Sequence, residues 1–352
     1  MPGPPDTMRL ALVTPHYFPS VGGNSVTVQR IESGLRDQGV AVRVFSLDRE
    51  DAEVIRAGLL RYRPDAVHGF HATKTGPLVL QATGALGIPA VITITGTDVN
   101  LDLLDPGHRP TVLRVLRAAQ AIVVFHESIR DRVLGEAPEV GPSIRVIGQT
   151  VQCHEAHYDL RGKLGLDRRD FVVFQPAGIR RVKNIPSVLP PLITLHGRHA
   201  HLRYVLAGPV IEPAEAARLD ALLRDLPWAF SLGTVTHEEV CAILPQVEVV
   251  VNSSLSEGGM SNAVLEAMSK GVPVLASDIE GNRSVIVDGQ DGFLFGSEAE
   301  FVEKVERLVD DPALRYALGR RAARKIATEF PLEGEIGGYL ALYRSLVAGE
   351  GG

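Results

Sequence analysis

Short apolar runs alternate with longer stretches of helical periodicity along the first half of the chain. A helix is predicted over residues 24–38, ending at Gly39. The predicted strands are 10–14, 40–45, 65–69, 89–95, 121–125 and 144–147. Strands that alternate with helices predict a mostly parallel sheet covered by helices on both faces.

The same pattern starts again after a polar, charged stretch at residues 150–170, which we interpret as the domain boundary. A helix opens near Ile185–Pro186, and further elements follow to the end of the chain. The strands are 171–175, 201–207, 229–232, 247–252 and 272–276, and the helices are 214–224, 298–309, 313–328 and 331–346. The sequence predicts an α/β protein with two doubly wound, Rossmann-like domains, residues 1–160 and 161–330. A C-terminal helix within 331–352 is expected to pack back towards the first domain.

Charge and hydropathy narrow the possible partners. The formal net charge is −6 and no long Lys/Arg run occurs, so no nucleic-acid partner is expected. Residues 1–8 lack the features of a signal peptide, and no run of about 18 apolar residues predicts a membrane span. Membrane contact would be peripheral at most, through residues 109–117, where an ordinary surface helix is the favoured interpretation. The oligomeric state is not predicted.

The chain has two cysteines, Cys153 and Cys241, far apart in sequence and outside any metal-ligand spacing. Disulfide scaffolding and a metal site are therefore not expected. A reducing cytoplasm is the expected location.

The most informative stretch is NSSLSEGGMSNAVLEAMSKGVPVLASD, residues 252–278. It leaves an apolar strand, turns at Gly258–Gly259 and enters a helix near Ser261–Asn262. A helix start at such a turn aims backbone N–H groups and a positive helix end at an anion. The two glycines would let the backbone approach a diphosphate closely.

Two glutamates, Glu257 and Glu266, flank this turn. A carboxylate is a suitable acceptor for two vicinal hydroxyl groups of a sugar or a ribose. Taken alone, both could be solvated surface residues. The glycine turn and the strands on either side favour ligand-binding roles.

A second stretch, AGIRRVKN at residues 177–184, follows the first strand of the second domain. Arg180 and Lys183 could reach one pyrophosphate and neutralise the charge on a leaving nucleoside diphosphate without a metal ion. Because Arg181 adjoins them, a solvated basic loop is the alternative. Because this stretch lies at the carboxyl end of a strand, a ligand-binding role is favoured over a solvated loop.

These stretches, together with residues 14–31 (TPHYFPSVGGNSVTVQRI) and 279–295 (IEGNRSVIVDGQDGFLF), resemble glycosyltransferase family 4, the group 1 glycosyl transferases. Within that family they look closest to the glycosyltransferase 1 domain-containing proteins. The resemblance implies a GT-B fold, in which two domains face each other across a cleft. It also implies retaining transfer of a sugar from a nucleoside-diphosphate sugar to a small-molecule or glycan acceptor. No metal or cofactor is implied, and a UDP-sugar is the default donor.

The resemblance also assigns roles to residues. Gly22–Gly23 and Asn24 would pack against the donor phosphates, and the loop Gly233–Val235 would lie at the base. Arg180 and Lys183 would hold the diphosphate, Glu257 the transferred sugar and Glu266 the ribose. The implied catalytic residues are Arg180, Lys183 and Glu257. The implied donor-binding residues are Gly22, Gly23, Asn24, Thr97, Asp98, Arg180, Lys183, Gly233, Val235, Glu257, Gly258, Gly259, Met260, Ser261 and Glu266.

Two departures from the family pattern affect these roles. Eight residues separate Glu257 from Glu266 where the family usually has seven, so the extra residue must bulge or displace Glu257. The fourth-strand loop, residues 95–98, lacks the family's histidine. Thr97 or Asp98 could supply a hydrogen bond instead, and a turn or N-cap role for Asp98 is equally open.

Histidines near the third and fifth strands are weaker candidates. His68 and His71 lie at the end of the third strand and could line the acceptor side or be structural. His126, at the end of the fifth strand, is similarly placed.

Other functions stay open at this point. A nucleotide-sugar epimerase of the same fold and a non-catalytic nucleotide-sugar-binding protein are the alternatives. An NAD-dependent dehydrogenase is disfavoured, because the first strand–helix loop lacks the G-x-G-x-x-G pattern.

Overall fold

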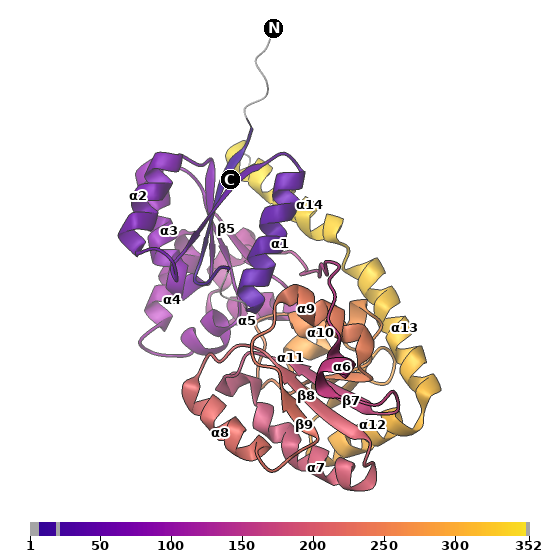
Figure 1. Cartoon of the computed structure of the whole chain (residues 1–352). Coiled ribbons are helices and arrows are strands. Elements are labelled where there is room, and N and C mark those ends of the chain that lie inside the picture. The colour runs from indigo at the N-terminus through magenta and orange to yellow at the C-terminus, as the bar shows by residue number, and fades with distance from the viewer. Residues whose placement is uncertain (1–6, 19–21, 350–352) are drawn as a thin grey trace. The chain divides into compact units, whose positions relative to one another are not determined.

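The computed structural model describes residues 7–18 and 22–349, and the chain divides into two compact units (Figure 1). The first unit contains Met1–Gln149 and Leu332–Gly352, and the second contains Thr150–Pro331. The boundary therefore lies at Gln149–Thr150 rather than at residue 160. The polar stretch that suggested the later position belongs to the second unit.

The first unit contains a six-stranded parallel sheet in the order β2-β1-β3-β4-β5-β6. Its strands are β1 (Arg9–Thr14), β2 (Ala41–Ser46), β3 (Ala66–Phe70), β4 (Ala90–Thr93), β5 (Ala121–Val124) and β6 (Ile144–Val146). Its helices are α1 (Gly23–Asp37), α2 (Ala52–Tyr62), α3 (Ala72–Leu86), α4 (Arg109–Ala118), α5 (Glu127–Glu136) and α14 (Leu332–Val347), with short helices at Asp98–Asp102 and Pro138–Ser143.

The second unit contains another six-stranded parallel sheet, in the order β12-β11-β10-β7-β8-β9. Its strands are β7 (Phe171–Pro176), β8 (Leu202–Ala207), β9 (Ala229–Ser231), β10 (Val249–Asn252), β11 (Val274–Ser277) and β12 (Phe293–Phe295). Its helices are α6 (Leu160–Leu164), α7 (Leu189–Arg198), α8 (Pro213–Leu223), α9 (His237–Ile243), α10 (Asn262–Ser269), α11 (Glu280–Arg283), α12 (Glu298–Asp310) and α13 (Pro312–Glu329), with short helices at Arg181–Lys183, Ile185–Val188 and Leu244–Gln246. The predicted pair of doubly wound parallel sheets is confirmed.

Strand burial explains why the central strands are apolar throughout. In β1, Leu10 and Leu12 pack into one hydrophobic core, whereas Ala11 and Val13 pack into another. Successive side chains of a strand point to opposite faces, and both faces of a parallel sheet are covered by helices. Figure 1 shows helices on both sides of the sheet in each unit.

The topology of the second unit determines where its site can form. From β7 the chain proceeds through β8 and β9 in one direction and returns to place β10, β11 and β12 on the other side. The order therefore reverses between the neighbouring strands β7 and β10. Ligands of open α/β sheets bind outside the carboxyl ends of the strands at such a switch point.

The helix α14 is part of the first unit although it lies at the end of the chain. Arg30 of α1 forms a two-pronged ion pair with Glu335 of α14, with Nε–Oε2 and Nη2–Oε1 distances of 2.7 and 3.0 Å. The two side chains are 3% and 0% exposed. This buried pair joins α14 to α1, the first helix after β1.

His68 also forms a hydrogen bond with α14. Its Nδ1 lies 2.6 Å from the Tyr343 hydroxyl of α14, and its Nε2 lies 2.6 Å from the Thr93 hydroxyl of β4. Burial lowers the pKa of His68 to about 3, so the ring is neutral. Of the two roles open to His68, the structure shows the structural one.

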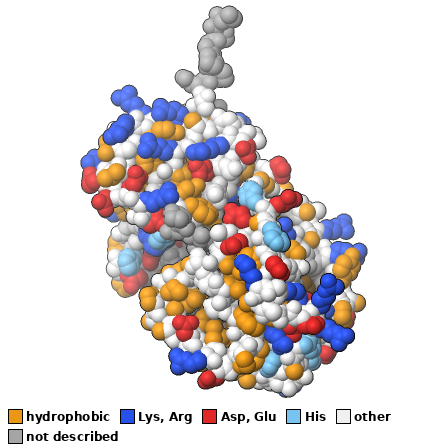
Figure 2. All heavy atoms as spheres, viewed as in Figure 1, with side chains coloured by type: hydrophobic (Ala, Val, Ile, Leu, Met, Phe, Trp, Pro, Cys, Tyr) orange, Lys and Arg blue, Asp and Glu red, His pale blue; other side chains and the backbone are white. Residues whose placement is uncertain are grey.

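The described residues include no helix that is long and apolar enough to cross a membrane. On the face drawn in Figure 2, basic and acidic side chains are intermixed.

Replacing Glu335 by alanine should destabilise the first unit by about 3–5 kcal/mol, because it leaves the buried Arg30 charge without a partner. Urea unfolding, followed through the transition of the first unit, measures this loss. The matched control is Glu53→Ala, which removes a largely exposed ion pair with Arg56 and should cost less than about 1 kcal/mol. Equal losses in the two variants would contradict the role given to Arg30–Glu335.

Candidate active site

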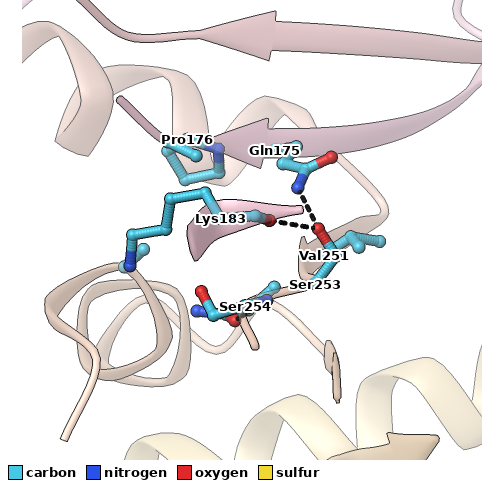
Figure 3. A pocket seen from close by; sticks show the side chains of 9 residues that line it. Gln175, Pro176, Lys183, Val251, Ser253 and Ser254 are labelled. Atoms are coloured by element: carbon cyan, nitrogen blue, oxygen red, sulfur yellow. Dashed lines mark hydrogen bonds between the residues drawn. The ribbon is translucent and has the colours of Figure 1, made fainter. Parts of the chain in front are cut away.

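The loops that follow β7 and β10 are joined by hydrogen bonds at the switch point of the second unit. Gln175 Nε2 donates to Ser253 Oγ over 2.8 Å, and Ser253 Oγ donates to the Lys183 carbonyl over 2.8 Å (Figure 3). The Leu255 amide donates to the Val182 carbonyl at 2.8 Å. These bonds fix the loop that carries Arg180 and Lys183 beside the loop that carries Glu257.

Lys183 and Glu257 form an ion pair within a small recess. Lys183 Nζ lies 2.6 Å from Glu257 Oε1, and the two side chains are only 16% and 12% exposed. The same oxygen accepts hydrogen bonds from Ser254 Oγ at 2.7 Å and from Asn252 Nδ2 at 3.1 Å. Lys183, Asn252 and Ser254 line the recess. Lys183 and Ser254 are labelled in Figure 3.

The Glu257 carboxylate is held in its charged form. Burial raises its pKa, but the Lys183 ammonium and the hydrogen bonds from Lys183, Ser254 and Asn252 outweigh burial and bring the pKa below its ordinary value. The family's usual spacing is exceeded by one residue, yet Glu257 still contacts the basic loop after β7.

Arg180 precedes the short helix Arg181–Lys183 and carries an unmet hydrogen-bond donor. Within the described part of the chain, its Nε is buried and has no hydrogen-bond partner. A buried donor without a partner costs about 1–3 kcal/mol or more when the group is charged. An anion bound beside Arg180 could remove that cost.

The amino end of α10 provides a second group that favours an anion. Its N-cap residue, Ser261, makes no side-chain capping bond to the helix. Instead, Ser261 Oγ accepts a hydrogen bond from Asn252 Nδ2 at 2.9 Å. The first turn therefore keeps the positive end of the helix dipole without a side-chain cap.

The turn between Glu257 and α10 packs closely against α11. A Cβ atom added to Gly281 would lie 2.5 Å from the Gly259 carbonyl oxygen and 2.7 Å from Glu257 Cβ. Position 281 therefore needs glycine for the turn to keep its place. The Met260 side chain is buried in the core, so only its backbone is available to a ligand.

Glu266, one turn into α10, is buried and faces a histidine of α9. Its Oε1 lies 3.0 Å from His237 Nε2. Thr236 begins α9 with a capping box that includes Glu239, which fixes the position of His237. Sequence reasoning missed His237, although its place directly after the loop 233–236 was an available signal.

The loop predicted to contact the base lies just before α9. Gly233 has a φ of +67°, and its carbonyl accepts a hydrogen bond from the Gly208 amide at 2.8 Å. The Val235 side chain packs into the core. The exposed part of this loop is therefore Gly233 and Thr234.

Gly22, Gly23 and Asn24 lie in the first unit, where Gly22 is the extended N-cap of α1. Asn24 Nδ2 donates to Thr14 Oγ1 at 2.6 Å, whereas its buried Oδ1 has no hydrogen-bond partner among the described residues. The helix has no side-chain cap and no acidic residue in its first turn. This amino end is thus also suited to an anion.

The loop after β4 gives Thr97 and Asp98 different roles. Asp98 is fully buried, and its carboxylate accepts hydrogen bonds from the amides of Ala72, Thr95 and Gly96. The structure therefore shows the turn-forming role for Asp98. Thr97 Oγ1 lies 2.8 Å from His71 Nε2, so a histidine stands beside this loop although the loop itself has none.

The prediction that the two cysteines provide no disulfide is wrong. Cys153 and Cys241 form a disulfide, with a Cα–Cα distance of 5.7 Å. Their separation of 88 residues is bridged because α9, which carries Cys241, packs beside the segment that follows Thr150.

The comparisons with known proteins agree with this architecture. Residues 176–311, which include Arg180, Lys183, Glu257 and Glu266, match the model of the family described as glycosyl transferases group 1. The chain is 27% identical over 340 residues to glycosyltransferase 1 domain-containing protein 1 of Xenopus tropicalis, covering 92% of this chain and 94% of the relative.

Two solved structures share the fold. Alr3699/HepE of Anabaena, crystallised with UDP and glucose, is 15% identical with a TM-score of 0.80, covering 96% of this chain and 100% of its own. Sucrose-phosphate synthase of Thermosynechococcus elongatus is 18% identical with a TM-score of 0.82, covering 97% and 100%. The two Rossmann-like halves thus have the GT-B fold. Over residues 176–311 the chain is thus similar to the group 1 glycosyl transferases.

Replacing Gly281 by alanine should lower the free energy of unfolding by about 1–3 kcal/mol, since the added methyl group overlaps the Glu257–Gly259 turn. Denaturant unfolding measures the change. In the control, Gly197→Ala of α7, the methyl group meets nothing within 4 Å. That variant should be unchanged or up to about 1 kcal/mol more stable. A fully stable Gly281→Ala protein would contradict the close packing.

Acid should weaken the second unit through Glu257. Because the folded-state pKa lies below that of the unfolded chain, about 4.3, the stabilising contribution is complete above that value. It is lost as the pH falls through the folded-state pKa. Urea midpoints measured between about pH 6 and pH 3 should therefore fall less steeply for Glu257→Gln than for the wild type. Equal slopes would show that the Lys183–Glu257 pair does not contribute.

Proposed function

We propose that this protein is a retaining, metal-independent member of glycosyltransferase family 4 that uses a nucleoside-diphosphate sugar as donor. A UDP-sugar is the first donor to test, and the acceptor is a small molecule or a glycan. The observation that carries the proposal is the group formed by Arg180, the Lys183–Glu257 pair and the uncapped amino end of α10. The UDP and glucose bound by the Anabaena neighbour support the choice of donor.

The donor diphosphate would bind between the two basic side chains and the start of α10. Lys183 has three donor hydrogens, so it can keep its bond to Glu257 while it donates to a phosphate oxygen. Arg180 would use its buried Nε, which has no partner among the described residues. These groups together would stabilise the negative charge that develops on the leaving diphosphate as the bond to the anomeric carbon breaks.

The reaction breaks the bond between the anomeric carbon and the phosphate oxygen. The acceptor hydroxyl forms the new bond from the same face of the sugar, so the anomeric configuration is retained. Its proton passes to the departing phosphate oxygen. The charge stabilisation from Arg180 and Lys183 would take the place of a metal ion in this step.

The two glutamates would hold opposite parts of the donor. Glu257, ionised and fixed by Asn252 and Ser254, would accept hydrogen bonds from hydroxyls of the transferred sugar. Glu266, fixed by His237, would accept those of the ribose. Gly233 and the backbone of Val235 would lie at the base.

Gly22, Gly23 and Asn24, at the amino end of α1, would contact the donor phosphates. The Thr97 hydroxyl would contact the sugar, with the His71 ring as its hydrogen-bond partner. The cytoplasm is the proposed location, and it is compatible with the disulfide only if that bond is reversible.

A panel of nucleoside diphosphates and their sugars, followed by thermal shift, tests the donor. A ligand at 100 times its dissociation constant should stabilise the protein by about 2.7 kcal/mol. NMR of the product formed from the best donor then tests retention. Epimerisation of the donor alone, or tight binding with no transfer to any acceptor in a broad screen, would contradict the proposal.

Arg180→Ala and Lys183→Ala should each lower transfer by about 10²-fold or more, because each removes a donor that stabilises the leaving group. Release of the nucleoside diphosphate in the presence of an acceptor measures this loss. The matched control is Arg181→Ala, whose exposed side chain lies on the same loop and should keep near-normal turnover. A loss of the same size in Arg181→Ala would indicate a general effect of loop charge.

A further inference from the structure

The disulfide ties the segment after the unit boundary to the helix that supports Glu266. Cys153 is partly exposed and lies in a stretch, residues 147–159, without helix or strand. Cys241 is buried in α9. These are the only two cysteines in the sequence, so the pair has no competing thiol within the chain.

One ring nitrogen connects the disulfide to Glu266. His237 Nε2 lies 3.0 Å from Glu266 Oε1 and 3.8 Å from Cys241 Sγ. His237 and Cys241 stand one turn apart on α9, so both are on the same helix face. The imidazole and the carboxylate are each only 6% exposed, and water therefore competes little for these contacts.

We propose that Cys153–Cys241 is a reversible thiol–disulfide site. Its redox state changes the strength of the hydrogen bond between His237 and Glu266, and with it the affinity of the protein for the ribose of the donor. The inference rests on the proposed function for its effect on the donor. The thiol–disulfide exchange itself does not depend on that function.

The chemistry of sulfur predicts that reduction of the disulfide weakens ribose binding. A disulfide sulfur carries neither a proton nor a charge, so the Nε2 hydrogen has Glu266 as its strong acceptor. Reduction turns Cys241 into a thiol or thiolate, which competes for the same imidazole nitrogen. Glu266 is then less firmly fixed, and a less fixed carboxylate binds the ribose hydroxyls more weakly.

The exchange balances with a small thiol as reductant. Its thiolate attacks the partly exposed Cys153 sulfur and breaks the disulfide, and Cys241 leaves as a thiolate beside His237. A second small thiol then releases Cys153, giving a protein dithiol and a small-molecule disulfide. The reverse reaction, with a small-molecule disulfide as oxidant, restores the bond.

The same three side chains could also form a metal site. The ligand atoms of Cys153, His237 and Cys241 lie within 4.8 Å of one another. Two thiolates and an imidazole are ligands that zinc accepts. A resident metal would remove the thiols from exchange, so it is a distinct outcome of the test.

The test uses the full chain equilibrated with oxidised or reduced glutathione. Intact mass after alkylation should show one disulfide in the first state and two alkylated thiols in the second. Calorimetry should show UDP binding at least about 3-fold more weakly to the reduced protein. Inorganic pyrophosphate, which lacks the ribose, should bind the two states equally. Equal UDP affinities in the two states would overturn the coupling.

The double variant Cys153→Ser/Cys241→Ser is the matched control and should bind UDP with one affinity under both conditions. A readout without ligand separates this inference from the proposed function. The side-chain NMR signals of His237, assigned by their loss in His237→Asn, should differ between the redox states of the wild type only. If UDP binds in neither state, the proposed function fails, and the His237 signals decide the redox site. Unchanged signals, or stoichiometric zinc that prevents oxidation, would overturn it.

Discussion

The parallel pairing of β7 with β10 is the constraint on which the candidate site depends. These strands are distant in sequence, but their carboxyl ends meet where the strand order reverses. The basic loop after β7 and the acidic turn after β10 are therefore neighbours. Ser253, bonded to both Gln175 and the Lys183 carbonyl, turns this proximity into a fixed geometry. The Lys183–Glu257 pair is a consequence of the sheet order rather than an isolated surface contact.

Much of the fold could be predicted because apolar runs and helical periodicity report local burial. Most strands lie within a residue or two of their predicted positions. The exception is β12, Phe293–Phe295, which was not predicted. The boundary at Gln149–Thr150 lies at the start of the predicted boundary stretch, residues 150–170, because its exact position depends on how contacts are distributed in space.

The candidate site could be predicted only where residue type, spacing and position on a strand end coincide. Arg180, Lys183 and Glu257 meet that condition. His237 and the Cys153–Cys241 disulfide do not, since they arise from the packing of α9 against α10 and against the segment after Thr150. Asp98 shows that an acid after a strand can also stabilise the local backbone, because its carboxylate accepts hydrogen bonds from three backbone amides.

The two glutamates of the site share a further property: each is held by a basic partner before any ligand binds. Glu257 has Lys183, and Glu266 has His237. A buried carboxylate needs such a partner, because removing a charge from water is costly unless it is paired and hydrogen-bonded. The partner also removes rotational freedom that ligand binding would otherwise have to remove. Lys183 has further N–H donors that an anion can use, whereas the single Nε2 of His237 also contacts the Cys241 sulfur. Under the proposals above, the first carboxylate would thus be coupled to phosphate binding, and the second would be coupled to the state of the disulfide.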